Sequence, residues 1–339
     1  MRLLLLSCAA SLLLYTLAFA CMLDRPLTLG ALRARIDANL ATGAMIAEPK
    51  LVVIAGSNGP YSHRCAIIGP LINRPCINAG VAVGIGLDYL FLRWQALLHP
   101  GDVVYLPLEE AQYARTRATV ALGPDAAIML RHDLASLRQM PLDRQLAALF
   151  SSDLRAAIMS LLETGLLHSG FRDPRMMATG AANVWGDHVG HTLALGADNA
   201  PTLAAQTPYH PTAAQIEHGY GMALVRGFLR WAATHQVRVV GGLPTGFADS
   251  PIGDASLAAI RAVYRDEGSD FLELPNRSRY PRADFFDSPD HLNEPAQIRH
   301  SWAVALALRP MVDRPIVSPP GQKVRLVTSD ADRSPPAQQ

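Results

Sequence analysis

The chain has 339 residues, half of them apolar, which is enough to bury a core in one large domain or two small ones. Its 30 basic residues are dispersed along the sequence and balanced by 29 acidic ones, so a nucleic-acid-binding surface is not expected.

The first segment is an uncharged apolar run from Leu3 to Met22, rich in Leu and Ala. About 20 apolar residues suffice to span a bilayer as a helix, whereas Ala-Phe-Ala at residues 18–20 fits the cleavage site of a signal peptide. Because the run is longer than an ordinary signal-peptide core, we favour an uncleaved signal anchor over residues 1–24. Both alternatives predict that the rest of the chain leaves the cytoplasm. It would be either a single-pass protein of the inner membrane with its soluble domain in the periplasm, or a protein secreted to the periplasm after cleavage.

Two of the four cysteines, Cys65 and Cys76, lie in the expected soluble part of the chain. Outside the cytoplasm they could form a disulfide that closes a short loop, and two buried thiols are the alternative. A zinc site is not expected, because His63 is the one further ligand near this pair.

After the apolar segment, short apolar strands alternate with helices. The pattern predicts helices at residues 27–40 and 87–98 and strands at residues 51–55, 76–79 and 103–108. This alternation predicts an α/β fold with a mainly parallel sheet.

The middle of the chain is less regular than the first part. Residues 124–166 have a helical pattern, and residues 168–211 are rich in Gly, Ala, Asn, Pro and Thr, which indicates a loop-rich insertion. The alternation then resumes, with helices expected at residues 213–235, 255–267 and 294–308 and strands at residues 237–241 and 271–274. The tail, residues 313–339, is expected to be disordered, so one α/β domain covers residues 25–312.

Two short motifs at opposite ends of this domain carry the chemistry. The first, Ala-Gly-Ser-Asn-Gly at residues 55–59, places Ser57 at a strand-to-helix turn. The second, Asp-Ser-Pro-Asp-His-Leu-Asn at residues 287–293, precedes the final helix. A serine hydroxyl needs a base to take its proton, and a histidine flanked by acids can serve as that base. Ser57 and His291 are therefore the candidate nucleophile and base of acyl chemistry.

Two acids compete for the position that orients the His291 ring. Asp287 lies four residues before the histidine, and Asp290 directly precedes it. Because a carboxylate on the adjacent residue reaches the ring of its neighbour with difficulty, we favour Asp287 and keep Asp290 as the alternative.

Backbone N–H groups at the ends of two strands could stabilise the oxyanion that acyl transfer forms. The N–H of Ser57 lies at a helix start, where the helix dipole favours negative charge. Gly80 ends the second strand, at the same edge of a parallel sheet, and offers a second N–H.

The combination of these motifs resembles the SGNH (GDSL-like) hydrolase superfamily: a strand followed by Gly-Ser-Asn, a strand followed by Asn-x-Gly, and a late Asp before His-Leu-Asn. It is similar in particular to the membrane-anchored extracytoplasmic branch with the D-alanyl-lipoteichoic acid transfer protein and the alginate O-acetylation proteins. The resemblance covers roughly residues 48–115 and 280–308. It implies a three-layer α/β/α sandwich, with Ser57 as nucleophile, His291 as base and Gly80 as an oxyanion donor.

The same resemblance implies acyl transfer to or from hydroxyls of a cell-envelope or exported polysaccharide. It also implies a partner, a membrane-bound O-acyltransferase that delivers the acyl group across the bilayer. No metal and no organic cofactor are expected.

The third block of the superfamily, Gly-x-Asn-Asp after the third strand, is absent from this chain. Residues 107–110 are Pro-Leu-Glu-Glu, so the asparagine that would supply a third oxyanion donor is missing. Gln112 could replace it chemically, or Asn183 could reach the site from the insertion. We expect structural roles for Glu109 and Glu110.

Two other interpretations use the same residues. Ala-x-Ser-x-Gly at residues 55–59 approximates the nucleophile elbow of α/β-hydrolases, although that elbow normally follows several strands and Ser57 follows the first. A non-catalytic SGNH-like scaffold that binds glycan or a membrane acyltransferase would explain the altered third block, whereas the retained Ser57, Asp287 and His291 favour an esterase or O-acyltransferase. Transfer and hydrolysis share an acyl-enzyme, so both remain open.

Overall fold

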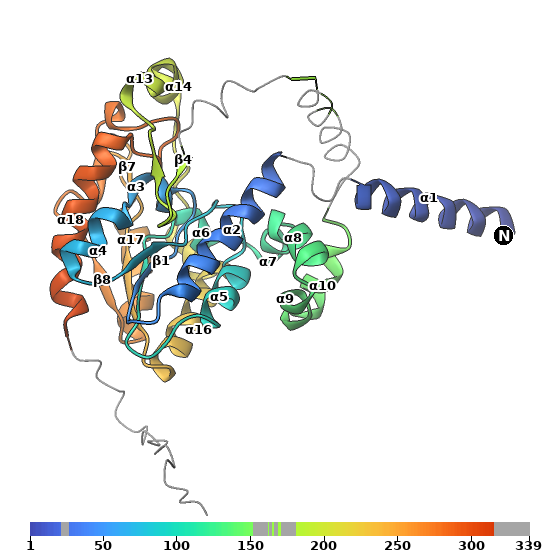
Figure 1. The fold of residues 1–339 in the computed structure, drawn as a ribbon, viewed down its shortest axis with the longest axis horizontal. Helices are drawn as coiled ribbons and strands as arrows, with labels where there is room; N and C mark the ends of the chain where they lie inside the picture. The colour runs from blue at the N-terminus through green and yellow to red at the C-terminus, as the bar shows by residue number, and fades with distance from the viewer. Residues whose placement is uncertain (22–26, 152–161, 163–164, 166–168, 171–180, 315–339) are drawn as a thin grey trace, which may run out of the picture.

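The computed structural model describes residues 1–21, 27–151 and 181–314, together with residues 162, 165, 169 and 170. A sheet lies at its centre, between layers of helices (Figure 1). This sheet has five parallel strands in the order β2-β1-β3-β6-β8. The strands are β1 (Leu51–Val53), β2 (Cys76–Asn78), β3 (Val103–Leu106), β6 (Arg238–Gly242) and β8 (Asp270–Leu272). The α/β fold with a mainly parallel sheet, expected from the sequence, is confirmed.

Helices cover both faces of the sheet, so β1, β2 and β3 are buried on both sides, whereas the edge strand β8 is partly exposed. Leu51 and Val53 face helices α4 (Cys65–Ile72) and α18 (Glu294–Val312), which lie side by side in Figure 1. Val52, between them in sequence, belongs to the core on the other face. The helices there are α2 (Leu27–Met45), α5 (Leu87–Gln95), α16 (Tyr220–Thr234) and α17 (Asp254–Asp266). Burial on both faces explains why the strands read as continuous apolar runs.

Two segments predicted as long helices are broken into shorter ones. The helix expected at residues 213–235 is divided into α15 (Ala213–Glu217) and α16, because the chain turns at Gly219, the N-cap of α16. Residues 124–148 form three helices, α8 (Pro124–His132), α9 (Leu134–Gln139) and α10 (Leu142–Ala148). Asp133 caps α9 with its side chain, and Pro141 directly precedes α10. The rest of the predicted helical region lies largely outside the described residues.

The described part of the insertion, residues 168–211, contains more regular structure than its composition indicates. It has a short hairpin of β4 (Ala181–Ala182) and β5 (His188–Val189), then α13 (Leu193–Gly196), η1 (Ala197–Asn199) and α14 (Ala200–Ala205). The side chain of Asn199 donates to Phe286 O at 2.9 Å, so this segment covers the loop that precedes α18. A cavity of about 320 Å³ lies between α13, α14 and Phe285.

The two ends of the chain bear on the predicted anchor and tail. The amino-terminal segment forms helix α1 (Arg2–Cys21), which extends away from the α/β domain in Figure 1. Within the described ranges, no helix is both long and apolar enough to cross a membrane, and the predicted signal anchor therefore finds no support in the structure. The predicted disordered tail lies outside the described residues except for Asp313 and Arg314.

Cys65 and Cys76 form a disulfide, the first of the two alternatives for this pair. The bond joins the start of α4 to β2, and both cysteines are buried. Asp187 supports the same junction, because its carboxylate accepts the N–H groups of Cys65 at 2.7 Å and of Ala66 at 3.0 Å.

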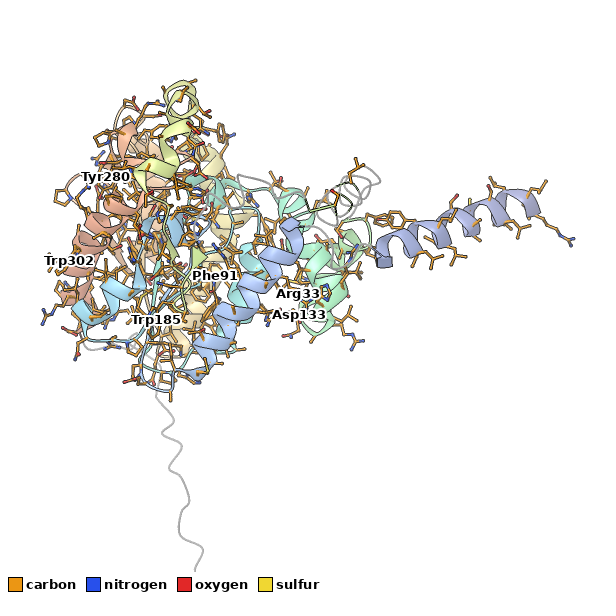
Figure 2. The ribbon with its side chains drawn as sticks, turned by 45° about the horizontal axis from the view of Figure 1, so that its top comes forward. Arg33, Phe91, Asp133, Trp185, Tyr280 and Trp302 are labelled. Atoms are coloured by element: carbon orange, nitrogen blue, oxygen red, sulfur yellow. A yellow bond between two sulfur atoms is a disulfide. The ribbon has the colours of Figure 1, made fainter. Side chains whose placement is uncertain are left out.

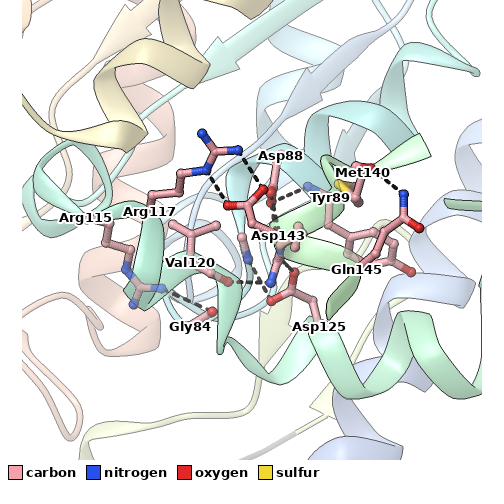
Figure 3. Close-up of polar contacts among 12 residues, drawn as sticks. Gly84, Asp88, Tyr89, Arg115, Arg117, Val120, Asp125, Met140, Asp143 and Gln145 are labelled. Carbon is pink, nitrogen blue, oxygen red and sulfur yellow. Dashed lines mark hydrogen bonds and ion pairs between the residues drawn. The ribbon is translucent and has the colours of Figure 1, made fainter. Parts of the chain in front are cut away.

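A network of charged side chains fixes the loop that follows β2 (Figure 3). Arg144 of α10 is buried and forms ion pairs with Asp88 of α5 and Asp125 of α8. Asp125 Oδ1 in turn accepts the N–H of Gly86 at 3.1 Å. Arg115, just after α6 (Glu110–Ala114), donates to Gly84 O at 3.1 Å. The helices around α10 and the loop after Gly80 are therefore held together by charge and hydrogen bonds.

Candidate functional site

The loops that follow the strands meet at one edge of the sheet. Ser57 follows β1, Gly80 follows β2, Glu109 follows β3 and Thr245 follows β6. The strand order reverses at β1, because β2 and β3 lie on its two sides. In open parallel sheets, ligands bind in the crevice at such a reversal. Ser57 follows β1 and Glu109 follows its neighbour β3, so the topology by itself favours a ligand site between the ends of these two strands.

Ser57 lies at the start of the short helix α3 (Asn58–Ser62). Its φ and ψ angles of −67° and −21° are already helical, and its side chain does not cap the helix. Among the described residues, its hydroxyl forms no hydrogen bond, and the residue is half-buried. A serine hydroxyl in this state is available as a nucleophile once a base takes its proton.

Asp287 and His291 face each other across a tight loop. An antiparallel bridge between Phe285 and Leu292 closes this loop, and the N–H of Phe286 donates to His291 O at 2.8 Å. In this geometry Asp287 Oδ1 lies 2.6 Å from His291 Nδ1. The four-residue spacing, one longer than in the superfamily that the motifs resemble, therefore still produces a hydrogen-bonded acid–base pair.

Asp290 fixes the position of this loop. Its carbonyl oxygen accepts hydrogen bonds from Ser62 Oγ and Thr245 Oγ1, each at 2.9 Å. Desolvation raises the pKa of its carboxyl group, while the nearby charges of His291 and Arg279 oppose this effect. In the part of the chain that the structure describes, the hydrogen-bonded partner of the His291 ring is Asp287 and not Asp290.

Tyr61 connects the histidine loop to the serine helix. Its ring stacks on the His291 ring, with centroids 4.0 Å apart and planes 9° apart. Tyr61 lies one helical turn after Ser57, and its N–H donates to Ser57 O at 3.4 Å. No hydrogen bond joins the Ser57 hydroxyl to His291 among the described residues. Such bonds are often long until substrate binds.

A set of polar rings, two of them buried histidines, anchors the other end of α3. The hydroxyl of Tyr280, which Figure 2 labels, lies 2.9 Å from His300 Nδ1. His300 Nε2 lies 3.3 Å from Nε2 of His63, the residue that ends α3. Burial lowers the pKa of His63 to about 4, so this ring is neutral near pH 7. These contacts connect α3 to α18 and so support the position of Ser57.

Gly80, a predicted oxyanion donor, packs directly against the serine turn. A Cβ atom at this position would lie 2.8 Å from Gly56 O and 2.9 Å from Gly59 Cα, so the close approach requires glycine. The N–H of Gly80 donates to Asn78 Oδ1 at 3.2 Å. Gly80 is therefore beside Ser57, as expected. Its hydrogen bond to Asn78 must break before its N–H can bind an oxyanion.

The two residues considered as substitutes for the missing asparagine have other partners. Asn183 Oδ1 accepts the N–H groups of Trp185 at 2.9 Å and of Asp187 at 3.0 Å, and Asn183 Nδ2 donates to Asp187. Gln112 Oε1 accepts the N–H of Glu109 at 3.0 Å in a capping box at the start of α6. Both side chains stabilise local turns, which argues against a role at the oxyanion.

Glu109 stands where the asparagine of the third block would stand, and it is 7% exposed. Its Oε1 lies 3.5 Å from the N atom of Asn58, and a Cβ atom added to Gly56 would collide with the same oxygen. Burial and the nearby charge of Asp290 raise the pKa of Glu109, whereas the N–H groups of Asn58 and Ser57 oppose this shift. The carboxyl group of Glu109 thus contacts the backbone of the turn that contains Ser57.

His188 and His191, which belong to no motif singled out in the sequence, also contact Tyr61. The Tyr61 ring stacks on His188 with centroids 4.1 Å apart and meets His191 edge-on at 5.3 Å. Burial lowers the pKa of His188 to about 3 and that of His191 to about 4. The three-residue spacing of these two histidines is the one feature of the sequence that could have indicated a shared site. Over the described ranges, no group of three or more His, Cys, Asp or Glu side chains could hold a metal ion.

The fold and the site define a class: an α/β protein with a parallel sheet that brings a serine and a histidine–aspartate pair to its carboxyl edge. The chain matches no family model, no curated protein and no solved structure. The similarity to the SGNH superfamily therefore depends on the motifs and on their placement, and membership is a proposal.

Proposed function

We propose that this protein is a serine-dependent esterase or O-acyltransferase with the α/β/α sandwich of the SGNH superfamily. The observation that carries the proposal is the hydrogen-bonded Asp287–His291 pair, whose histidine stacks on Tyr61 of the helix that starts at Ser57. A histidine with a purely structural role would not require a hydrogen-bonded acid, a stacked aromatic ring and a serine with an unbonded hydroxyl at the same edge of the sheet.

In this proposal, Ser57 Oγ attacks the acyl carbonyl while His291 Nε2 takes the hydroxyl proton. Asp287 accepts the hydrogen bond from His291 Nδ1–H and stabilises the charge that the ring acquires. The N–H of Gly80 leaves Asn78 Oδ1 and donates to the oxyanion, and His291 returns the proton to the leaving alcohol. Water or a sugar hydroxyl then attacks the acyl-serine by the same steps in reverse, which gives hydrolysis or transfer.

The substrate class in this proposal is hydroxyl groups of a cell-envelope or exported polysaccharide, outside the cytoplasm. The disulfide between Cys65 and Cys76 supports this compartment, because such bonds persist in oxidising environments. A membrane-bound O-acyltransferase is the partner that the motifs imply, and the apolar amino-terminal segment directs the chain out of the cytoplasm as an anchor or as a cleaved signal.

The test is intact-mass analysis of the full-length protein after exposure to p-nitrophenyl acetate. We expect one acetyl adduct that is lost in Ser57→Ala, with p-nitrophenol release impaired in both Ser57→Ala and His291→Ala. Ser288→Ala, a half-buried serine within the histidine loop, is the matched control and should keep the adduct. An adduct retained in Ser57→Ala would exclude Ser57 as the nucleophile. The absence of both adduct and turnover in the wild type would favour the scaffold interpretation.

A further inference from the structure

We propose that the Glu109 carboxyl group, in its neutral form, donates a hydrogen bond to the oxyanion that forms when Ser57 is acylated. This inference rests on the proposed function and adds one catalytic residue to it. It also offers an answer to the missing asparagine of the third block, whose position Glu109 occupies in the chain.

The position of Glu109 is the first argument. It follows β3 directly across the strand reversal from Ser57, and its Oε1 contacts the turn formed by Gly56 and Asn58. Gly56 must be glycine for this contact, because a Cβ atom there would meet the carboxyl group. A carboxyl group placed solely to cap α6 would not need to lie against the serine turn.

The charges around Glu109 are the second argument. Its neighbour Glu110 is paired with Arg279 at 2.9 Å and with His210 at 2.7 Å. Glu109, in contrast, forms no ion pair among the described residues. Arg115, whose charge acts on Glu109, donates instead to Gly84 O. A nearly buried carboxyl group without a paired cation favours its neutral form.

The groups that face Glu109 act in both directions. The carboxyl group of Asp290 and the burial of the site raise its pKa, and Arg115 and the N–H groups of Ser57 and Asn58 lower it. The net shift is upward, in agreement with a neutral acid near pH 7.

The chemistry of the oxyanion is the third argument. A carboxylate at this place would repel the negative charge that develops on the substrate oxygen, and such repulsion is strong in a site shielded from water. A neutral carboxyl group has a carbonyl oxygen that accepts the Asn58 N–H and a hydroxyl group that can donate. The proton stays on Glu109 throughout, so this is a hydrogen bond and not a proton transfer. A neutral glutamate can therefore donate the hydrogen bond to the oxyanion that an asparagine amide would otherwise donate.

The test compares Glu109→Gln, Glu109→Leu and Glu110→Gln in the full-length protein, with p-nitrophenyl acetate as substrate and the Ser57→Ala rate subtracted. Glutamine keeps a donor that does not ionise, so Glu109→Gln should retain kcat near pH 7. It should also keep its activity at alkaline pH, where the wild type declines. Leucine removes the donor, and kcat should fall by roughly 10²- to 10³-fold. Glu110→Gln should keep the alkaline decline of the wild type.

Three outcomes would overturn the inference. Glu109→Leu could match the wild type, Glu109→Gln could be as slow as Glu109→Leu, or Glu109→Gln could keep the alkaline decline. Near-UV circular dichroism of each variant reports whether it folds. If Glu109→Leu does not fold, the pH profile of Glu109→Gln decides alone. A wild type that forms no Ser57-dependent adduct would overturn the proposed function itself. A normal adduct with unchanged Glu109 variants would overturn this inference only.

Discussion

The His291 ring is held by two contacts that differ in kind. Asp287 accepts a hydrogen bond from Nδ1 at 2.6 Å, and Tyr61 stacks on the face of the ring at 4.0 Å. The hydrogen bond sets which nitrogen carries the proton, and the stack limits rotation of the ring. Together they direct Nε2 away from Asp287 and make it available to accept a proton.

At the residue scale, Asp287 and Asp290 can be separated by one pair of substitutions. In Asp287→Asn the side chain no longer stabilises a charged imidazole, so kcat should fall by roughly 10²- to 10⁴-fold with little change in KM. Asp290→Asn keeps the backbone carbonyl that binds Ser62 and Thr245, and its effect on kcat should be much smaller. Steady-state kinetics with p-nitrophenyl acetate measures both. A larger loss in Asp290→Asn would assign the orienting role to Asp290.

The sequence predicted some of these residues and could not predict others. Ser57, Asp287 and His291 lie in short motifs whose residue types suit one kind of chemistry. Tyr61 and His188 carry no such signal, because their role is a ring contact between segments that are more than 100 residues apart. The contact between the Glu109 carboxyl group and the Gly56 turn likewise arises only when β1 and β3 pair.

At the element scale, the strands could be predicted better than the middle helices. Strands β1, β2 and β3 are buried on both faces, so their apolar runs are visible without any knowledge of the fold. The helices around residues 124–148 depend on Asp133 and Pro141, which end one helix and start the next. A window that averages hydrophobicity passes over such local signals.

The charged network of Figure 3 links these middle helices to the site. Arg144→Met leaves the buried carboxyl groups of Asp88 and Asp125 without their cation, so the free energy of unfolding should fall by roughly 3–5 kcal/mol. Arg117→Ala is the matched control, because Arg117 and Asp143 form a pair that is about half exposed, with side-chain exposures of 56% and 49%. Its loss should lower the free energy of unfolding far less, because solvent screens an exposed ion pair. Urea unfolding measures the free energy of unfolding of both variants. Equal losses would show that the buried network contributes no more stability than the exposed ion pair.

At the scale of the whole molecule, the sheet order determines where the site lies. β2 and β3 flank β1, so the loops after these three strands converge on Ser57 from both sides. Residues 287–293 complete the site from the other end of the chain, because the loop before α18 crosses the same edge. The alternation of strands and helices predicted the fold class. The strand order itself has no signal in a single sequence, since it depends on which strands pair.

The disulfide is the one covalent link between elements in the described residues, and it stabilises the β2 side of the sheet. Cys65 and Cys76 are 11 residues apart, and a closed loop of that size should contribute about 2–3 kcal/mol to the free energy of unfolding.

Cys65→Ala combined with Cys76→Ala should therefore lower the urea midpoint. Dithiothreitol should lower the midpoint of the wild type and leave that of the double variant unchanged. Cys8→Ser removes an exposed free thiol and should respond to dithiothreitol as the wild type does. If dithiothreitol lowers the midpoint of the double variant equally, the reductant acts elsewhere and the loop contributes nothing measurable. The predicted result would mean that the fold around Ser57 depends on an oxidising compartment for part of its stability.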